Sequence, residues 1–366
     1  MTRPDLSPDA AAPSADNALI LLAREAADIA VAGDIKRGLA LALDAIRRAR
    51  DAGDTRAEME ALNAAARCHS LRNDSINALA AGIDAAALAR RLGDGAALGH
   101  ALCAIANTAF TLRLLEECEP FIVHAIEEGV RHADADLEAR ARQSYGVLLG
   151  DLKRFDEARA QLALAVEVAR RDGRPALLLR VEGNLANVAR KEVRHHAATG
   201  DGARLNQAGA AALAEAALIL ERARTLNVPS VEMNMTHFIA EVRALMGELD
   251  VGIHETSRAM DMAQQLRYAS NQPPMALNLG RMLRDQGRLT ESIAAIQRGL
   301  DAAENLRPTF RIAELCEAMA ATESACGDTA KAETWQKRAL QERAQFETGR
   351  QVAAGFLARL GKELAL

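Results

Sequence analysis

Two short groups of residues have the side chains that metal sites use. His195 and His196 are adjacent, and neighbours in sequence point to different sides of a helix, so a metal would need further ligands from elsewhere. We interpret them as surface histidines on a long helix. Asp134, Asp136 and Glu138 resemble a calcium loop but lack its glycine and its distal bidentate glutamate. Acidic residues in the first turn of a helix explain this group better, and we expect no metal.

Catalytic motifs are equally scarce. The sequence contains no HExxH, no GxSxG and no dinucleotide fingerprint. Gly355 and Gly361-Lys362 approach a phosphate loop, but their spacing is one residue too long and Glu363 stands where Ser or Thr is needed. No strand is predicted before them, so we interpret this segment as the end of a capping helix. We therefore predict a protein that is not an enzyme and has no cofactor.

The cysteines and the N-terminus indicate the compartment. The five cysteines are odd in number, form no C-x-x-C pair and lie in helical patterns: Cys68, Cys103, Cys118, Cys316 and Cys326. This is typical of a reducing intracellular compartment. Residues 1–16 are rich in Pro, Ala and Asp without an apolar run, which predicts a disordered leader and no signal peptide. No stretch approaches the roughly 18 apolar residues of a membrane span, so we predict a cytoplasmic protein.

Composition favours closely packed helices. Hydrophobic residues make up 49% of the chain, but aromatic residues only 3%, and Ala and Leu dominate the apolar share. Strands favour β-branched and aromatic residues instead. The net charge of −5 comes from 45 basic and 50 acidic residues that are interspersed. The sequence has no cluster of basic residues of the kind that binds nucleic acids or a membrane surface. We therefore expect neither a nucleic acid nor a membrane as a partner.

The turns that must separate these helices recur at a fixed interval. Gly53-Asp54 and Gly93-Asp94 lie 40 residues apart. A second series repeats with the same step and consists of Gly33, Asn73, Arg113 and Lys153, and later of Gly247, Gly287 and Gly327. The interval from Lys153 to Gly247 is 94 residues, which equals two repeats plus 14. One repeat therefore carries an insertion of 14 residues, and the period predicts a repeat architecture.

Small residues recur in step with the turns. One column consists of Ala26, Ala66, Ala106, Gly146, Ala186, Ala240, Gly280 and Ala320. Two further columns lie 12 and then 7 residues later in each repeat, with the 14 inserted residues added to the first step in repeat five, and all their members are small except Ile219. Helix axes approach to about 8–10 Å only where the side chains at the contact are short. The columns therefore mark helix–helix contacts.

Three small-residue columns in a helix–turn–helix unit resemble the tetratricopeptide repeat (TPR) family. The resemblance covers residues 17–345 and implies an all-α fold, an α-α superhelix of about eight helix–turn–helix repeats. Residues 346–366 would form a C-terminal capping helix, and residues 192–205 would be the insertion in repeat five. The chain departs from the commonest form in having 40 residues per repeat instead of about 34. Three segments resemble the regulatory arrays of bacterial diguanylate cyclase and helix-turn-helix signalling proteins, although no output domain is recognised: Asn184-Leu185-Ala186-Asn187, Gly287-Arg288-Leu289 and Gly327-Asp328.

In the TPR family the first helix of each pair lines a concave groove that holds ligands. The resemblance places these polar residues there: Asn63, Arg67, His100, Asn107, Arg140, Gln143, Arg180, Asn187, Arg190, Asn234, His237, Arg281 and Arg284. Amides pair with both N–H and C=O of an extended peptide backbone, and guanidinium groups grip carboxylates with two hydrogen bonds. Arg140, Arg180, Arg190 and Lys191 against Asp151 would make the middle of the groove basic. A solvated helix face is the competing interpretation of each residue.

These observations favour a binding protein over an enzyme. The main hypothesis is a non-catalytic scaffold that holds a protein or peptide segment, of acidic character, as a bacterial signalling or regulatory adaptor. One alternative is a sensor of a small acidic metabolite or peptide signal. The other is a self-associating scaffold, a homodimer whose seam is formed by the C-terminal helix with Phe356, Leu357, Leu360 and Leu364.

Overall fold

The structure, a computed structural model, describes residues 15–31, 34–173, 175–304, 306 and 309–365. The predicted leader and Gly33 lie outside these residues, except that the first helix already begins at Ala15. The helices are α1 (Ala15–Val31), α2 (Ile35–Ala52), α3 (Thr55–Leu71), α4 (Ser75–Leu92), α5 (Gly95–Thr111), α6 (Leu115–Arg131), α7 (Ala135–Asp151), α8 (Phe155–Arg171), α9 (Pro175–Thr199), α10 (Gly202–Thr225), α11 (Pro229–Leu245), α12 (Leu249–Gln265), η1 (Ala269–Asn271), α13 (Gln272–Asp285), α14 (Leu289–Glu304), α15 (Arg311–Ala325) and α16 (Thr329–Leu364).

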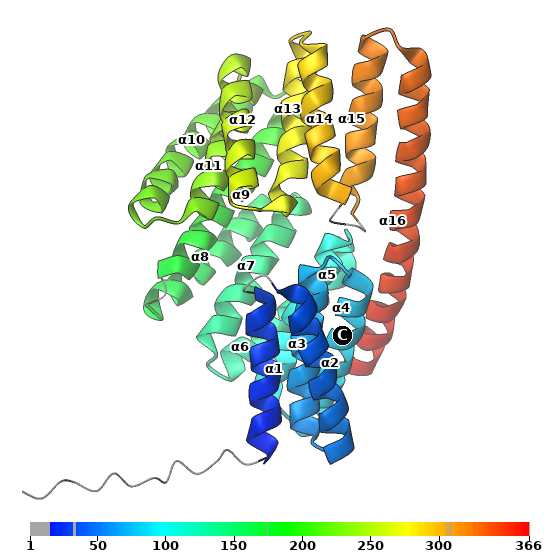
Figure 1. Cartoon of the computed structure of the whole chain (residues 1–366). Coiled ribbons are helices and arrows are strands. Elements are labelled where there is room, and N and C mark those ends of the chain that lie inside the picture. Colours follow the sequence, from blue (N-terminus) through cyan, green and yellow to red (C-terminus); the bar gives the residue numbers. More distant parts are fainter. Residues whose placement is uncertain (1–14, 32–33, 174, 305, 307–308, 366) are drawn as a thin grey trace, which may run out of the picture.

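The helices form antiparallel pairs that stack into an α-α superhelix (Figure 1). Each helix packs against the next in sequence, and the first helices of consecutive pairs also contact each other, from α1 and α3 to α13 and α15. The first helices therefore form the inner layer. Within the described residues no strand occurs, and the predicted all-α repeat fold is confirmed.

The predicted turns have the backbone conformation that ends a helix sharply. Asn73, Arg113 and Lys153 adopt φ of 59°, 60° and 62°. The later members of the series are also left-handed: Gly247, Gly287 and Gly327. A left-handed residue after a helix lets the next N–H groups return to the last carbonyls. After Gly53, the side chain of Asp54 accepts a hydrogen bond from the Ala57 N–H at 2.9 Å and caps α3. A glycine followed by an aspartate thus ends one helix and caps the start of the next.

Asp134 belongs to the same set of caps. Its Oδ1 accepts a hydrogen bond from the Leu137 N–H at 3.0 Å at the start of α7, and its Oδ2 lies 2.9 Å from Nε2 of His100. The carboxylate of Asp134 therefore caps a helix, which agrees with the interpretation of this acidic group as the start of a helix.

The small-residue columns lie at helix crossings. Ala106 and Ala186 are fully buried, and Gly146 is buried in α7 against α8. A Cβ at Gly146 would lie 2.5 Å from Cγ of Leu162 and 3.1 Å from the carbonyl oxygen of Ala158. The close approach that the column predicts is therefore real at this crossing.

The fifth pair is longer than its neighbours. The α9 and α10 helices have 25 and 24 residues, whereas α7 and α8 have 17 each. Gly200 and Asp201 join the two long helices. The two histidines of α9 are half-buried, which corrects the expectation of surface histidines: the ring of His195 lies 5.9 Å from that of Phe155, and Nε2 of His196 lies 3.9 Å from Oε1 of Glu192.

The last helix differs from the expected separate cap. The α16 helix continues without a break from Thr329 to Leu364, so residues 346–364 are its second half. This half runs down one side of the molecule in Figure 1 and packs against α4 and α6. Leu357 and Leu360 are 2% exposed in the hydrophobic cluster of the N-terminal repeats. Because the chain itself covers these two leucines, they cannot form the predicted dimer seam.

Candidate binding groove

Three connected hollows follow the inner layer of first helices. The first has a volume of about 580 Å³ and lies mainly between α3 and α5. The second, of about 350 Å³, lies among α5, α7 and α9 and shares Asn107 and Arg140 with the first. The third, of about 410 Å³, lies among α7, α9 and α11 and shares Gln143 and Arg180 with the second. We call this continuous surface the inner groove.

The inner groove collects most of the predicted site residues. Its lining includes Asn63, Arg67, His100, Asn107, Arg140, Gln143, Arg180, Asn187, Arg190, Asn234 and His237. Arg281 and Arg284 are not part of it: Arg281 is exposed on α13, and Arg284 lies 3.2 Å from the carboxylate of its neighbour Asp285. The arrangement of first helices therefore brings together residues from five repeats but not from the seventh.

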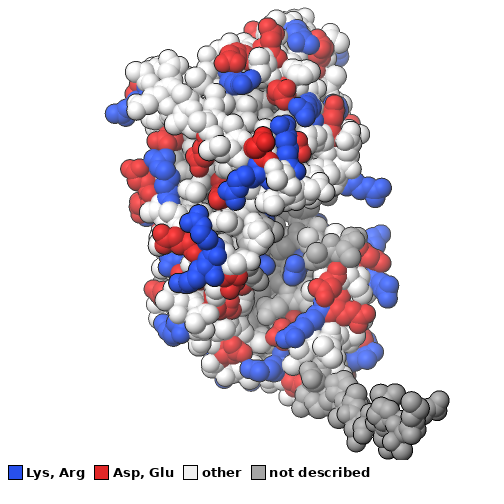
Figure 2. All heavy atoms as spheres, turned by 90° about the vertical axis from the view of Figure 1, so that its left-hand side faces the viewer, with Lys and Arg blue, Asp and Glu red and all other residues white. Residues whose placement is uncertain are grey.

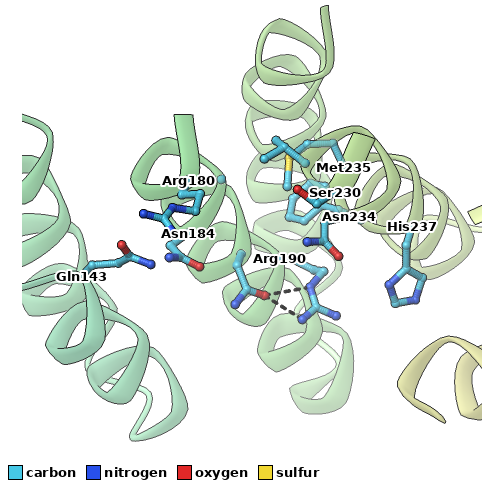
Figure 3. Close-up of a pocket in the computed structure, with 12 residues that line it drawn as sticks. Gln143, Arg180, Asn184, Arg190, Ser230, Asn234, Met235 and His237 are labelled. Atoms are coloured by element: carbon cyan, nitrogen blue, oxygen red, sulfur yellow. Dashed lines mark hydrogen bonds between the residues drawn. The ribbon is translucent and has the colours of Figure 1, made fainter. Parts of the chain in front are cut away.

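The third hollow is rich in amides (Figure 3). Gln143 of α7 points toward Arg180 and Asn184 of α9, and Ser230 and Asn234 approach from α11. Gln143 and Asn184 are half-buried, and among the described residues neither has a hydrogen-bond partner. Two amides with unused donors and acceptors thus face one cavity.

The other two amides of this hollow are partly engaged. Oδ1 of Asn187 accepts a hydrogen bond from Nη2 of Arg190 at 2.7 Å. Oδ1 of Asn234 accepts one from Nδ2 of Asn271 at 2.8 Å. Their own NH₂ groups can still donate. Asn184 and Ser230 were not predicted as site residues, although Asn184 lies one turn before Asn187 on the same helix, which was the available signal.

A buried carboxylate holds the two arginines at the end of the third hollow. Nη1 of Arg190 lies 2.5 Å from Oε2 of Glu241, and Arg194 is hydrogen-bonded to Oε1 of the same carboxylate. Nδ2 of Asn278 donates a further bond to Glu241 at 2.9 Å. Burial alone would raise the pKa of Glu241, but the two arginines lower it to about 2. The carboxylate is therefore ionised and acts as a fixed counter-ion.

The neighbouring histidine is neutral. Burial lowers the pKa of His237 to about 4, against the opposing effect of Glu241. Its Nε2 lies 3.2 Å from Nδ2 of Asn278, which donates to it. His237 therefore serves as an acceptor in this network and adds no cation to the inner groove.

The basic centre expected of the groove is largely neutralised by the chain itself. Arg190 is paired with Glu241, Arg140 lies 2.9 Å from Oδ2 of Asp136, and Nζ of Lys191 lies 2.6 Å from Oδ1 of Asp151. Only Asp151 was expected to oppose these cations, and the pairing of Arg140 with Asp136 and of Arg190 with Glu241 was not foreseen. Basic and acidic side chains are likewise mixed over the face drawn in Figure 2, without a patch of one sign.

The first hollow differs in its charge. Arg67 is exposed there, and within the described part of the chain it has no hydrogen bond or ion pair. Asn63 is half-buried beside it, and Nδ2 of Asn107 lies 3.6 Å from Sγ of Cys103. Burial raises the pKa of the Cys103 thiol to about 11, so the thiol stays protonated. The first hollow thus presents the amides of Asn63 and Asn107 beside the exposed cation, and the protonated thiol of Cys103 lines the neighbouring second hollow.

Two other classes of site are absent from the residues that the structure describes. No group of three or more His, Cys, Asp or Glu side chains there could hold a metal ion. No helix among those residues is both long and apolar enough to cross a membrane.

Comparisons with known proteins support the fold. No protein-family model matches the sequence, and no curated protein matches it. Solved structures do match. A Rap protein complexed with competence and sporulation factor has 12% identity and a TM-score of 0.61, over 95% of this chain and 99% of that one. The Rap conjugation gene regulator of plasmid pLS20, in complex with the Phr* peptide, has 12% identity and a TM-score of 0.60, over 92% and 97%.

A third structure, aspartyl phosphate phosphatase F from Bacillus subtilis, has 13% identity and a TM-score of 0.54, over 92% of this chain and 85% of that one. Likeness at this level of identity shows the architecture, and the chain has the fold of a TPR-like helical solenoid.

Proposed function

We propose that this chain is a non-catalytic regulatory protein that holds an extended peptide segment in its inner groove. The observation that carries the proposal is the pair of half-buried amides, Gln143 and Asn184, that face one cavity without a partner among the described residues. A hydrogen bond formed by an amide that water can still reach contributes about 0.5–1.5 kcal/mol net. A ligand that supplies both donors and acceptors would form such bonds with both amides, and a peptide backbone offers a donor and an acceptor at every residue except proline.

The shape of the groove supports a linear ligand. The hollows join end to end across α3, α5, α7, α9 and α11. A small metabolite would occupy only one of them, whereas an extended chain can use amides in each. The Rap regulator with the Phr* peptide has a similar fold, which supports the same ligand class here.

An acidic side chain or a C-terminal carboxylate of the peptide is the finer proposal. Arg67 is the exposed cation that would meet it in the first hollow, and Arg180 lies between the second and third. Guanidinium groups bind carboxylates through paired hydrogen bonds. A small acidic metabolite at Arg180 is the second candidate. The self-associating scaffold loses its support because Leu357 and Leu360 are covered within the chain.

A role in bacterial signalling, in the cytoplasm, remains a prediction, as does the likeness to arrays that accompany diguanylate cyclases. One structural neighbour is named a phosphatase, and we propose no such reaction for this chain. The thiol in the groove is protonated, and the histidine at its end is buried and neutral.

A selection from random linear peptides tests the proposal. A displayed library of random twelve-residue peptides would be passed over the immobilised full chain and over a heat-denatured sample. We expect enrichment of linear sequences on the folded chain only. The absence of enrichment over the denatured sample would contradict the proposal.

A further inference from the structure

A separate hollow lies on the opposite face of α9 from the inner groove. It has a volume of about 470 Å³ and is enclosed by α8, α9 and α10. Leu185, Ala189, Glu192 and His196 of α9 line it, and none of these residues lines the inner groove. The α8 and α10 helices lie at the left-hand edge of Figure 1, on the side that Figure 2 presents.

The hollow exists because repeat five departs from its neighbour. Leu149 of α7 and Leu152, the residue that follows α7, are matched 40 residues later by Ala189 and Glu192 of α9. Leu149 is fully buried in the core, whereas the methyl group of Ala189 leaves that space open. Ala208, Ala211 and Ala212 of α10 form the facing wall. Small side chains on both walls thus create a cavity where the preceding repeat is filled.

The insertion contributes to the rim. Glu192, His196 and Arg204 all belong to the segment predicted as inserted, and all three line the hollow. The extra turns of α9 and α10 therefore form part of its walls. The insertion thus enlarges the hollow as well as lengthening the two helices.

Most charged groups that face this hollow are already paired. Nη1 of Arg159 lies 2.6 Å from Oε2 of Glu192, and its Nη2 lies 2.9 Å from Oδ1 of Asp156. Nε2 of His196 lies 3.9 Å from Glu192, and Nε of Arg204 lies 3.4 Å from Asp201. The arginines on the wall thus already have carboxylates of the chain as counter-ions.

Glu215 is the exception. It is half-buried, and within the described residues no donor or cation makes a hydrogen bond or ion pair with its carboxylate. Burial raises the pKa of Glu215; Arg159 opposes this rise, and the carboxylate of Glu182, itself paired with Arg222 at 2.5 Å, adds to it. An acceptor that lacks a donor therefore lies beside an apolar floor of Leu185 and Ala189.

We propose that this hollow binds an aliphatic primary ammonium group, with the ammonium at Glu215 and its methylene stem on Leu185, Ala189 and Ala211. A compact ammonium has three donors and fits a single carboxylate. Its alkyl stem gains from contact with the apolar wall. An anion would instead face the carboxylates of Glu192 and Glu215. The group can belong to a lysine of a partner protein or to a free diamine.

Calorimetric titration of the full chain tests the site without any groove ligand. The probes are 1,5-diaminopentane and N-acetyl-lysine methylamide, with n-pentanol as the uncharged analogue. We expect saturable binding of at least one amine and none of the alcohol. Glu215→Gln should weaken binding by about tenfold or more, which corresponds to one lost charge-assisted hydrogen bond. Glu221→Gln, an exposed glutamate on the same helix, makes the same charge change outside the hollow and should leave binding unchanged.

A second variant fills the space instead of removing the charge. Ala189→Leu restores the side chain that α7 has at Leu149 and should abolish amine binding while the melting temperature stays within a few degrees. Binding of the diamine but not of the lysine derivative would assign the site to a free amine, and the reverse would assign it to a protein side chain. No saturable binding of either amine, or equal binding by Glu215→Gln, overturns the proposal. Because the inner groove is not involved, neither result of this titration bears on the proposal that the inner groove binds a peptide.

Discussion

Arg190 of α9 and Glu241 of α11 form an ion pair at 2.5 Å across the wall of the inner groove. Their side chains are 17% and 8% exposed, so both charges are largely removed from water. Arg194 and Asn278 complete the environment of the carboxylate. The pair ties together the first helices of two consecutive repeats, α9 and α11, which are separated in sequence by the long α10. Arg190 is therefore first a structural residue, and reversal of its charge is a poor test of ligand binding.

Glu241→Gln should destabilise the protein strongly. The change leaves two guanidinium groups without their shared counter-ion, and loss of one partner of a buried pair costs about 3–5 kcal/mol. Urea unfolding followed by circular dichroism measures the loss. Glu248→Gln is the matched control, because Glu248 is exposed and lies 3.9 Å from Arg243 at its nearest, and it should change stability by less than about 1 kcal/mol. Equal stability of the two variants would contradict the assigned pair.

Acidification should destabilise the chain in two ranges. The folded pKa of His237 is lowered from 6.5 to about 4, so its contribution is present above pH 6.5 and is lost as the pH falls through 4. The folded pKa of Glu241 is lowered from 4.5 to about 2, so its contribution is present above pH 4.5 and is lost toward pH 2. Urea unfolding at pH 7, 5 and 3 should show Glu241→Gln to be less sensitive than the parent below pH 4.5. Parallel curves would show that Glu241 is not the group responsible.

Two glycines in helix interiors should respond in opposite ways to alanine. A Cβ at Gly146 would lie 2.5 Å from Cγ of Leu162, whereas at Gly183 its nearest neighbour would be Cε of Met235 at 3.9 Å. Gly146→Ala should cost about 1–3 kcal/mol by overpacking. Gly183→Ala should stabilise the chain by about 0.5–1 kcal/mol through helix propensity. Thermal unfolding distinguishes them, and a stabilised Gly146→Ala would remove the physical basis of the small-residue column.

The docked half of α16 should stabilise the N-terminal repeats. Leu357→Ala opens a cavity between α16 and the cluster of repeats one to four, at a cost of about 2–5 kcal/mol. Val352→Ala on the same helix is the control, because Val352 is 46% exposed and should change stability by less than about 0.5 kcal/mol. Hydrogen exchange should rise in α4 and α6 in the first variant only. Unchanged exchange there would place the helix elsewhere, and light scattering would then show whether a second copy covers it.

The repeat architecture was predictable because the same turn residues and the same small contact residues recur in each repeat. Gly53 and Asp54 mark a turn by their own chemistry, and Gly146 marks a contact by its size alone. The pairing of Arg190 with Glu241 was not predictable in the same way. The partners are 51 residues apart in sequence. The position of a residue within its repeat predicts the helix face on which it lies, but it does not show which charged residue of another helix pairs with it.

The end of the chain shows the same limit. The apolar face of residues 346–364 is visible in the sequence, but the surface that covers it depends on the pitch of the whole superhelix. A small difference in pitch would place α4 and α6 out of reach of Leu357. The sequence therefore predicts that this face is covered, whereas only the assembled fold shows that the same chain covers it.

Affinity for a selected linear peptide, measured with paired amide variants, tests peptide binding in the inner groove most directly. Fluorescence anisotropy would compare the parent with Gln143→Ala, Asn184→Ala and the control Asn206→Ala, an exposed amide of α10 outside the groove. Each groove variant should weaken binding by about fivefold to tenfold or more, since one hydrogen bond contributes about 1 kcal/mol or more, with unchanged melting temperature. The control should bind as the parent does. Equal affinity of all four proteins would contradict binding through the inner groove.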